Sequence, residues 1–265
     1  MLTLYFSGTG NTEYIAQSFS NKMGAECASI EADVDFIDTI ERHDTICFCY
    51  PIYASRVPLI MRKFVQAHIE TLKGKKIIIF ATQWLFSGDG ARVFTDLFPP
   101  GYIEVIYAEH FNMPNNVSNI FILREISNKR MEHIIKKADA KMTRTCQNIK
   151  RGVVKKRGFG AFSQFLGKLQ GVPWQKDSRN FDVTPKTAEH KSVNSVRIDN
   201  DCTMCGICAK ICPMENIVIN NNGIMPKCNC TVCYRCVNAC PQRAIKVMFK
   251  AKPKWQYKGV KDIRR

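Results

Sequence analysis

The sequence predicts an α/β protein, in which a doubly wound, five-stranded parallel sheet precedes a small α+β module organised by cysteines. Three observations support this fold class. Short apolar segments alternate with helical patterns over residues 1–148. A loop rich in glycine and hydroxyl side chains follows the first apolar segment. Two copies of one cysteine spacing lie within residues 197–250.

The alternation of strands and helices can be followed along residues 1–148. Strands are predicted where the chain is apolar, at residues 1–6, 25–30, 45–50, 76–81 and 102–111. Helices are predicted after the first strand and at residues 58–69, 89–98 and 120–150. The uninterrupted apolar run at 76–81 is typical of a strand buried in a parallel sheet. Such a sheet binds ligands at the carboxyl ends of its strands.

The loop between the first strand and the first helix has the composition of an anion site. It reads Ser-Gly-Thr-Gly-Asn-Thr over residues 7–12. Backbone N–H groups at such a loop and at the helix N-terminus point toward a phosphate, and the hydroxyl groups add neutral donors. The loop lacks the lysine of a nucleoside-triphosphatase loop, and Glu13 stands where the dinucleotide motif requires a third glycine. The sequence therefore predicts a phosphate site of another kind.

Two cysteine runs share the spacing C-x2-C-x2-C-x3-C-P, which is the spacing of two-cluster bacterial ferredoxins. In that arrangement, three cysteines of a run bind one cluster and the fourth binds the other cluster. We therefore predict two 4Fe–4S clusters with crossed ligands. One cluster is assigned to Cys202, Cys205, Cys208 and Cys240. The other is assigned to Cys230, Cys233, Cys236 and Cys212.

Three other interpretations of these cysteines are less consistent with the sequence. A disulfide framework suits secreted proteins, and nothing in the sequence indicates secretion. Zinc ribbons use isolated C-x2-C pairs, so a third cysteine at the same step is surplus. Scattered core thiols would not repeat one spacing twice. Cys228 stands just outside the second run, but only Cys230 restores the full spacing.

Residues 1–148 resemble flavodoxins, and the loop at 7–12 matches the loop that holds the FMN phosphate in that family. The resemblance implies phosphate contacts from Ser7, Gly8, Thr9, Gly10, Asn11 and Thr12. It implies a first flavin-contacting loop after the third strand, at Pro51, Ile52, Tyr53 and Ala54. It implies a second after the fourth strand, at Thr82, Gln83, Trp84, Phe86, Ser87, Gly88, Asp89 and Gly90. Tyr53 and Trp84 are the candidates to cover the flavin ring, and ordinary packing is the alternative for each.

The chain as a whole resembles a flavodoxin–ferredoxin fusion of the kind found in anaerobic bacteria. The flavodoxin-like domain spans 1–148, the two-cluster ferredoxin-like domain spans 197–250, and 251–265 is predicted to be a mobile basic tail. A basic linker at 149–196 joins the domains and belongs to neither family. Its helical stripe of Phe159, Phe162, Phe165, Leu166 and Leu169 is expected to dock onto a neighbouring domain, with a membrane surface or a partner as the alternatives.

The net charge of +16 is concentrated in the second half of the chain. Residues 1–148 carry no net charge, although flavodoxins are usually acidic, whereas 149–198 and 199–265 each carry +8. This distribution indicates either a docking surface for an acidic redox protein or a counter-charge to the chain's own cofactors. The cysteine region lacks the interleaved basic and aromatic residues of nucleic-acid binders. No apolar run approaches the ~18 residues of a membrane span, and no signal peptide is visible, so we expect a cytoplasmic protein.

These observations lead to two functional hypotheses. The first is an electron-transfer protein that passes single electrons between two 4Fe–4S clusters and FMN, and on to a redox partner. The second is an FMN-dependent reductase that acts directly on a small quinone-like or nitro compound. No acid–base catalyst is apparent, because the five histidines are dispersed and form no motif. A pocket with room for a second planar ligand over the flavin would favour the reductase.

Overall fold

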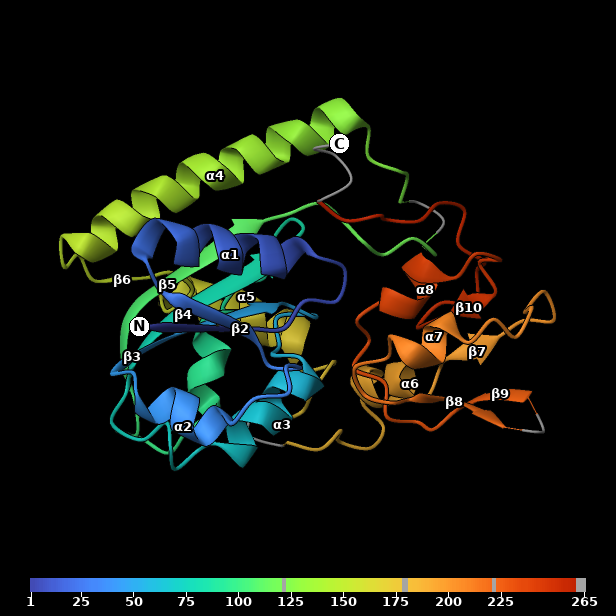
Figure 1. The fold of residues 1–265 in the computed structure, drawn as a ribbon, viewed down its shortest axis with the longest axis horizontal. Coiled ribbons are helices and arrows are strands. Elements are labelled where there is room, and N and C mark those ends of the chain that lie inside the picture. The colour runs from blue at the N-terminus through green and yellow to red at the C-terminus, as the bar shows by residue number, and fades with distance from the viewer. Residues whose placement is uncertain (121–122, 178–180, 221–222, 261–265) are drawn as a thin grey trace.

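The computed structural model describes residues 1–120, 123–177, 181–220 and 223–260. A larger body built on a parallel sheet lies beside a smaller C-terminal module, shown in orange and red in Figure 1. The carboxyl-terminal edge of the sheet faces that module. No helix in the described part of the chain is long and apolar enough to cross a membrane.

The sheet has the strand order β2-β1-β3-β4-β5-β6, and all of its strand pairs are parallel. Its strands are β1 (Leu2–Tyr5), β2 (Glu26–Ser29), β3 (Thr45–Pro51), β4 (Lys76–Gln83), β5 (Glu104–Asn112) and β6 (Lys155–Lys156). The five predicted strands are confirmed. Their order, 2-1-3-4-5, is one of the two common orders of doubly wound sheets. The sixth strand, β6, was not predicted. It is two residues long and comes from the segment predicted to be linker.

Helices cover both faces of the sheet. One face carries α1 (Asn11–Met23) and α4 (Asn128–Lys150), and the other carries α2 (Phe36–Glu41), α3 (Leu59–Ala67) and the 3-10 helix η1 (Arg92–Leu97). The helix predicted at 89–98 is present as the shorter 3-10 helix η1, and the helix predicted at 120–150 begins at residue 128. Ser127 caps α4 by accepting a hydrogen bond from the backbone N–H of Arg130, which explains this start.

Aromatic side chains fill the cores on the two faces of the sheet. On one face, the rings of Phe19 and Phe80 meet edge to face with their centroids 4.9 Å apart. On the other, Phe48 packs on Phe94, with centroids 4.7 Å apart. These side chains are fully buried. The sheet therefore forms a packed support from which the loops at its carboxyl edge project.

The linker contains two helices, α5 (Ala161–Gly171) and α6 (Ala188–Val193). The apolar stripe of α5 does not dock as predicted: Phe162, Phe165 and Leu169 are 75%, 58% and 60% exposed. The helix packs instead through Gly167 and Gly171, whose missing side chains allow close approach to Asp89 and Arg56. Within the stripe, Phe159 is the residue that packs partly against the core of the larger body.

The C-terminal module combines two small antiparallel sheets with two short helices. β7 (Arg197–Ile198) pairs with β10 (Ile245–Lys246), and β8 (Ile217–Asn220) pairs with β9 (Gly223–Pro226). The helices are α7 (Ile207–Lys210) and α8 (Arg235–Ala239), and each begins inside one of the cysteine runs. The module has its own buried cluster, which includes Trp174, Val237 and Ile245.

The segment that follows the module is packed rather than mobile up to residue 260. Trp255, Tyr257 and Val260 are buried. The Trp255 ring N–H donates to the carbonyl of Leu123, at 3.0 Å. The prediction of a mobile tail is therefore wrong for these residues, because aromatic anchors hold the segment against the larger body. The remainder of the predicted tail, 261–265, lies outside the described residues.

Candidate functional site

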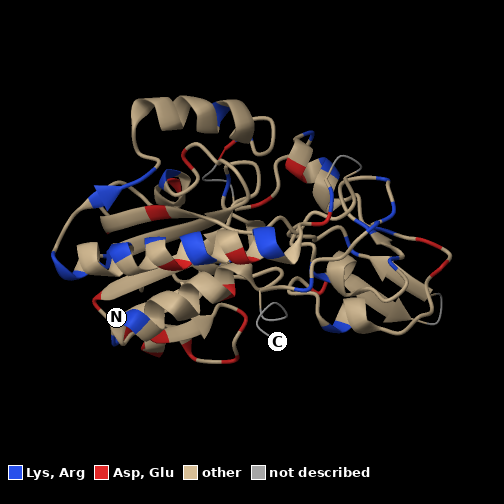
Figure 2. Ribbon diagram, turned by 90° about the horizontal axis from the view of Figure 1, so that it is seen from above, with Lys and Arg blue, Asp and Glu red and all other residues tan. Residues whose placement is uncertain are grey.

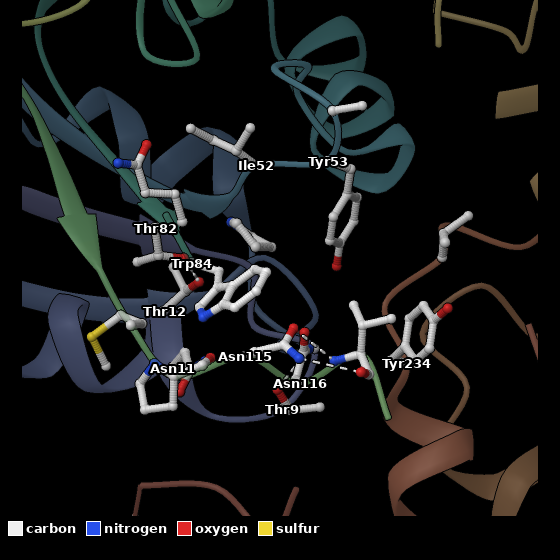
Figure 3. Close-up of a pocket in the computed structure, with 18 of the residues that line it drawn as sticks. Thr9, Asn11, Thr12, Ile52, Tyr53, Thr82, Trp84, Asn115, Asn116 and Tyr234 are labelled. Carbon is white, nitrogen blue, oxygen red and sulfur yellow. Dashed lines mark hydrogen bonds between the residues drawn. The ribbon is translucent and has the colours of Figure 1, made fainter. Parts of the chain in front are cut away.

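A cavity of about 340 Å³ opens where the carboxyl ends of the strands face the C-terminal module. Its volume lies near the lower end of the range for pockets that hold one small ligand. Twelve residues predicted from the sequence line it: Ser7, Gly8, Thr9, Asn11, Thr12, Pro51, Ile52, Tyr53, Ala54, Thr82, Gln83 and Trp84. The three loops therefore converge on one cavity, as the predicted sheet requires (Figure 3).

The loop at 7–12 leaves several backbone donors for an anion. Its turn depends on Gly10, which has a φ of 92° in the left-handed region. The first hydrogen bond of α1 runs from the N–H of Tyr14 to the carbonyl of Gly10, so the N–H groups of residues 11–13 have no acceptor within the helix. These donors lie at the positive end of α1, where a phosphate is favoured.

The threonine hydroxyl groups of this loop are held in place by neighbouring loops. The hydroxyl of Thr12 forms a 2.7 Å hydrogen bond with that of Thr82. The hydroxyl of Thr9 accepts a hydrogen bond from the side-chain amide of Asn116, at 2.9 Å, and keeps its own proton for another acceptor. The hydroxyl groups are therefore oriented before a ligand binds.

Two aromatic side chains project toward the cavity from neighbouring loops (Figure 3). Trp84 is 40% exposed. The hydroxyl of Tyr53 is buried and has no hydrogen-bond partner among the described residues. Burial raises the pKa of Tyr53 well above its ordinary value, and the nearby Cys233 and Cys230 raise it further. The hydroxyl therefore stays protonated, and a polar atom of a bound ligand would satisfy it.

The structure places the other predicted flavin contacts elsewhere. Phe86 is 52% exposed and does not line the cavity. Ser87 is buried and donates to the side chain of Gln83. Gly88 packs against α5, Asp89 forms an ion pair with Arg92 at 2.8 Å, and the carbonyl of Gly90 accepts from Tyr50. Beyond Trp84, the loop after β4 turns beneath α5. The sequence did not predict that this helix lies there. Gly10 shapes its own loop but does not line the cavity either.

Sequence reasoning missed several residues that line the cavity. One group follows β5, at Met113, Pro114, Asn115, Asn116 and Val117. The rule that ligands bind at the carboxyl ends of parallel strands could have found this group, because it directly follows a predicted strand. A second group belongs to the linker and the C-terminal module, at Trp174, Val232, Tyr234 and Met248. No signal in the sequence indicates that these residues close the same cavity.

Two smaller cavities lie in the C-terminal module, and each is bordered by four cysteines. One is lined by Cys202, Cys205, Cys208 and Cys240. The other is lined by Cys212, Cys230, Cys233 and Cys236. Each run thus contributes three cysteines to one cavity and its fourth to the other, which is the donor set that crossed 4Fe–4S ligation requires. Cys228 is exposed and lines neither cavity.

The two cysteine runs repeat one backbone conformation at an offset of 28 residues. Met204 and Val232 have φ angles of 60° and 59°, and Glu215 and Arg243 have 48° and 52°. These left-handed conformations turn backbone N–H groups onto cysteine sulfurs. The N–H of Val232 donates to Cys230 at 3.2 Å, and three further bonds of this kind reach Cys202, Cys212 and Cys240. Such bonds favour thiolates and tune the potential of a cluster.

Burial disfavours ionised thiols in the second run unless metal is bound. Burial, together with the neighbouring Cys233, raises the pKa of Cys230 to about 12, and burial raises that of Cys233 to about 11. Thiolate ligands at these positions therefore depend on a metal centre to offset their charge. Among the described residues, no three His, Cys, Asp or Glu side chains are close enough to bind a single metal ion. A cuboidal cluster instead binds each thiolate at a different iron.

The loop at residues 7–12, called the phosphate loop below, is in direct contact with the second cysteine run. A Cβ atom built on Gly8 would overlap the carbonyl oxygen of Cys233 and lie 3.1 Å from its Cβ. Arg235 donates hydrogen bonds to the carbonyls of Ser7 and Gly8, at 2.8 and 3.2 Å. The cavity at the sheet and the second cysteine-lined cavity are therefore neighbours that share one wall.

Comparison with known proteins supports the assignment of the larger body. Residues 2–117 match the family model of the flavodoxin domain. Among solved structures, the chain is similar to two-electron reduced Megasphaera elsdenii flavodoxin, with 22% identity over 53% of this chain and 99% of that chain and a TM-score of 0.38. It is similar to the Trp repressor binding protein from Bacillus subtilis, with 14% identity over 54% and 96% and a TM-score of 0.40. No curated protein matches. The family match supports a flavodoxin-like, FMN-binding domain in the N-terminal part of the chain.

Proposed function

We propose that this chain is an intramolecular electron-transfer protein, which carries FMN in its flavodoxin-like domain and two 4Fe–4S clusters in its C-terminal module. When bound, FMN exchanges one or two electrons and each cluster exchanges one. The observation that carries the proposal is the shared wall between the two sites. Val232 and Tyr234, which flank the cluster ligand Cys233, also line the cavity at the sheet. A short route therefore connects the two groups of cofactors.

The positions of the cysteines also suggest an order for the cofactors. The site of Cys212, Cys230, Cys233 and Cys236 borders the phosphate loop, so we assign its cluster as the one next to FMN. In the other site, Cys205 is exposed and Cys202 is partly exposed. Met204 and Ile207 beside them are 49% and 37% exposed. We assign that site as the point where electrons enter from, or leave to, a partner.

The dimensions of the cavity favour an electron carrier over a reductase of small molecules. A reductase needs room for a planar substrate in addition to the flavin. A cavity of about 340 Å³ is near the lower limit for a single ligand. Trp174 and Met248, from the second half of the chain, close it on the side of the module. The reductase therefore stays an alternative without an observation in its favour.

The proposal is tested by an anaerobic visible spectrum of the purified chain, together with counts of iron, sulfide and flavin. The expected composition is about eight irons and one FMN per chain. Chemical reduction of the clusters should then be followed by bleaching of the flavin within the same molecule, at a rate independent of protein concentration. A preparation that binds iron stoichiometrically but no flavin would contradict the proposal.

Two substitutions, one at each end of the proposed FMN site, should differ in their effect on riboflavin binding. Thr12→Ala should weaken FMN binding by about 1.5–3 kcal/mol, because it removes a hydroxyl at the phosphate end, and should leave riboflavin binding almost unchanged. Tyr53→Phe should weaken the binding of both flavins equally, because the buried hydroxyl lies at the ring end. Equilibrium binding of FMN and riboflavin to each variant measures the difference. Equal losses with both flavins in Thr12→Ala would mean that loop 7–12 does not bind the phosphate.

We further propose an acidic redox protein as the external partner. Part of the positive charge is used inside the chain: Lys141, Lys155 and Arg157 surround the buried carboxylate of Glu109. Lys246 pairs with Asp199 at 2.7 Å. Further Lys and Arg residues lie along α4 and over the C-terminal module, among others elsewhere in the chain (Figure 2). An acidic partner would be attracted by this excess, and neither a membrane nor nucleic acid is needed to account for it.

The proposed partner predicts a salt-dependent rate of electron transfer. Exposed charges are screened over about 8 Å at physiological ionic strength. Reduction of the chain by an acidic ferredoxin or flavodoxin should therefore slow steeply as salt is added, through its association rate. Reduction by a small uncharged reductant is the control and should not change. Stopped-flow traces across a salt series make the comparison, and a flat dependence with every acidic carrier would refute the docking model.

A further inference from the structure

Arg235 lies between two cysteines of the second run and reaches across to the phosphate loop. Its guanidinium group donates to the carbonyl of Ser7 at 2.8 Å and to that of Gly8 at 3.2 Å. It also forms a bidentate pair with Glu31, at 2.8 and 2.7 Å, and donates to the carbonyl of Ile211 at 3.1 Å. Its side chain is 25% exposed. One side chain therefore links the phosphate loop, the loop after β2 and both cysteine runs.

These hydrogen bonds constrain the peptide groups of the phosphate loop. In a trans peptide the carbonyl and the N–H of the next residue point in opposite directions. Arg235 holds the carbonyls of Ser7 and Gly8 on the side of the C-terminal module, so the N–H groups of Gly8 and Thr9 are directed away from it. Both residues line the cavity. An N–H group that is already oriented loses little conformational freedom when an anion binds, so less free energy is spent on ordering the loop.

The position of Arg235 is set in turn by the second cysteine run. Tyr234, which precedes it, adopts a left-handed φ of 62° at the start of α8. Cys233 and Cys236 on either side are the proposed ligands of the cluster next to FMN. In the unloaded chain these buried thiols have no covalent anchor. Ligation of iron at both positions would fix the backbone on each side of Arg235.

We propose that Arg235 is a positioning residue for the FMN phosphate, and that FMN and the cluster held by Cys212, Cys230, Cys233 and Cys236 therefore strengthen each other's binding. This inference rests on the proposed function, because it requires both cofactors. Coupling between two binding sites is reciprocal. The order of assembly follows: the FMN site reaches full affinity only after the neighbouring cluster is in place.

The test measures the affinities of the full-length chain for FMN and riboflavin by ultrafiltration, with the clusters loaded. Arg235→Gln is expected to weaken FMN binding about tenfold, which corresponds to about 1.4 kcal/mol, and to change riboflavin binding much less. Arg235→Lys should recover part of the loss, because an ammonium group still donates to the loop carbonyls. Arg197→Gln is the matched control, since Arg197 is an exposed arginine of the same module. Iron counts verify that every variant carries its clusters.

A second arm compares FMN affinity in iron-free and reconstituted wild-type chain. Reconstitution should tighten FMN binding about tenfold, and the gain should shrink in Arg235→Gln. Equal FMN affinity with and without iron, or an Arg235→Gln variant that binds FMN as tightly as wild type, would overturn the inference while leaving the proposed function intact. A wild-type chain that binds no FMN at all would overturn both. Parallel losses of FMN and riboflavin would show that Arg235 only supports the fold.

Discussion

Replacing Cys212 by alanine is expected to destroy the cluster proposed at Cys230, Cys233 and Cys236, and to spare the cluster proposed at the other three cysteines of its own run. The reason is that Cys212 lines the cavity bordered by those three cysteines, not the cavity of Cys202, Cys205 and Cys208. Iron should fall from about eight to about four per chain. The module should also lose stability, because metal binding and folding are linked in small metal-bound units.

Cys240→Ala is the matched control for this experiment. Cys240 is the fourth cysteine of the other run and lines the cavity of Cys202, Cys205 and Cys208. Electron paramagnetic resonance of the remaining cluster in each variant identifies the one that is lost. The proposed cluster next to FMN is missing only in Cys212→Ala. Reduction of the flavin by the remaining cluster should therefore fail in Cys212→Ala and persist in Cys240→Ala. Loss of the Cys202 site in Cys212→Ala would refute crossed ligation.

The sheet could be predicted because its signal is local and its strands are buried. A strand such as β4, with Ile77, Ile78 and Ile79 fully buried, reads as a continuous apolar run whatever surrounds it. The phosphate loop could be predicted equally well, since Gly10 and the neighbouring residues with hydroxyl groups follow directly after β1. The grouping of the cysteines around two cavities could be predicted because their spacing is that of a two-cluster ferredoxin, in which the fourth cysteine of each run crosses to the other site. These assignments depend on few contacts between distant residues.

The features that the sequence did not predict depend on contacts between distant segments. The stripe on α5 has the pattern of a docking face, yet Gly167 and Gly171 make the contact, because Asp89 and Arg56 approach them too closely for a larger side chain. Tyr257 donates to the side chain of Asn11 at 2.6 Å, across nearly the whole length of the chain. The basic composition of this segment had predicted a mobile tail. Pattern rules evaluate neighbours along the chain and cannot detect such pairs.

The contacts of Arg235 could not be predicted from the sequence for the same reason. Arg235 stands between two cysteines at a position that the spacing leaves open, where an arginine indicates only additional positive charge. Its hydrogen bonds go to the carbonyls of Ser7 and Gly8, which any residue at those positions would supply. Backbone acceptors leave no trace in a sequence. The shared wall between the cavity at the sheet and the second cysteine-lined cavity is therefore visible only in the structure.

Gly8→Ala is expected to disrupt that wall and to weaken both sites at once. The added Cβ would overlap the carbonyl oxygen of Cys233, which is backbone and cannot rotate aside. Overpacking of this kind typically costs about 1–3 kcal/mol. The phosphate loop and the second cysteine run must separate, so FMN binding should weaken and the cluster of Cys233 should become labile, while the cluster of Cys202 persists.

Gly160→Ala is the matched control, because a Cβ there meets no atom within 4 Å and its φ of −68° suits alanine. It should leave the stability of the chain and both cofactors almost unchanged. The measurements are FMN affinity, iron content and the rate of iron release to a chelator. A Gly8→Ala chain that binds FMN and retains iron as well as Gly160→Ala would mean that the two halves are not in tight contact at Cys233. The short route for electrons between cluster and flavin would then lose its structural basis.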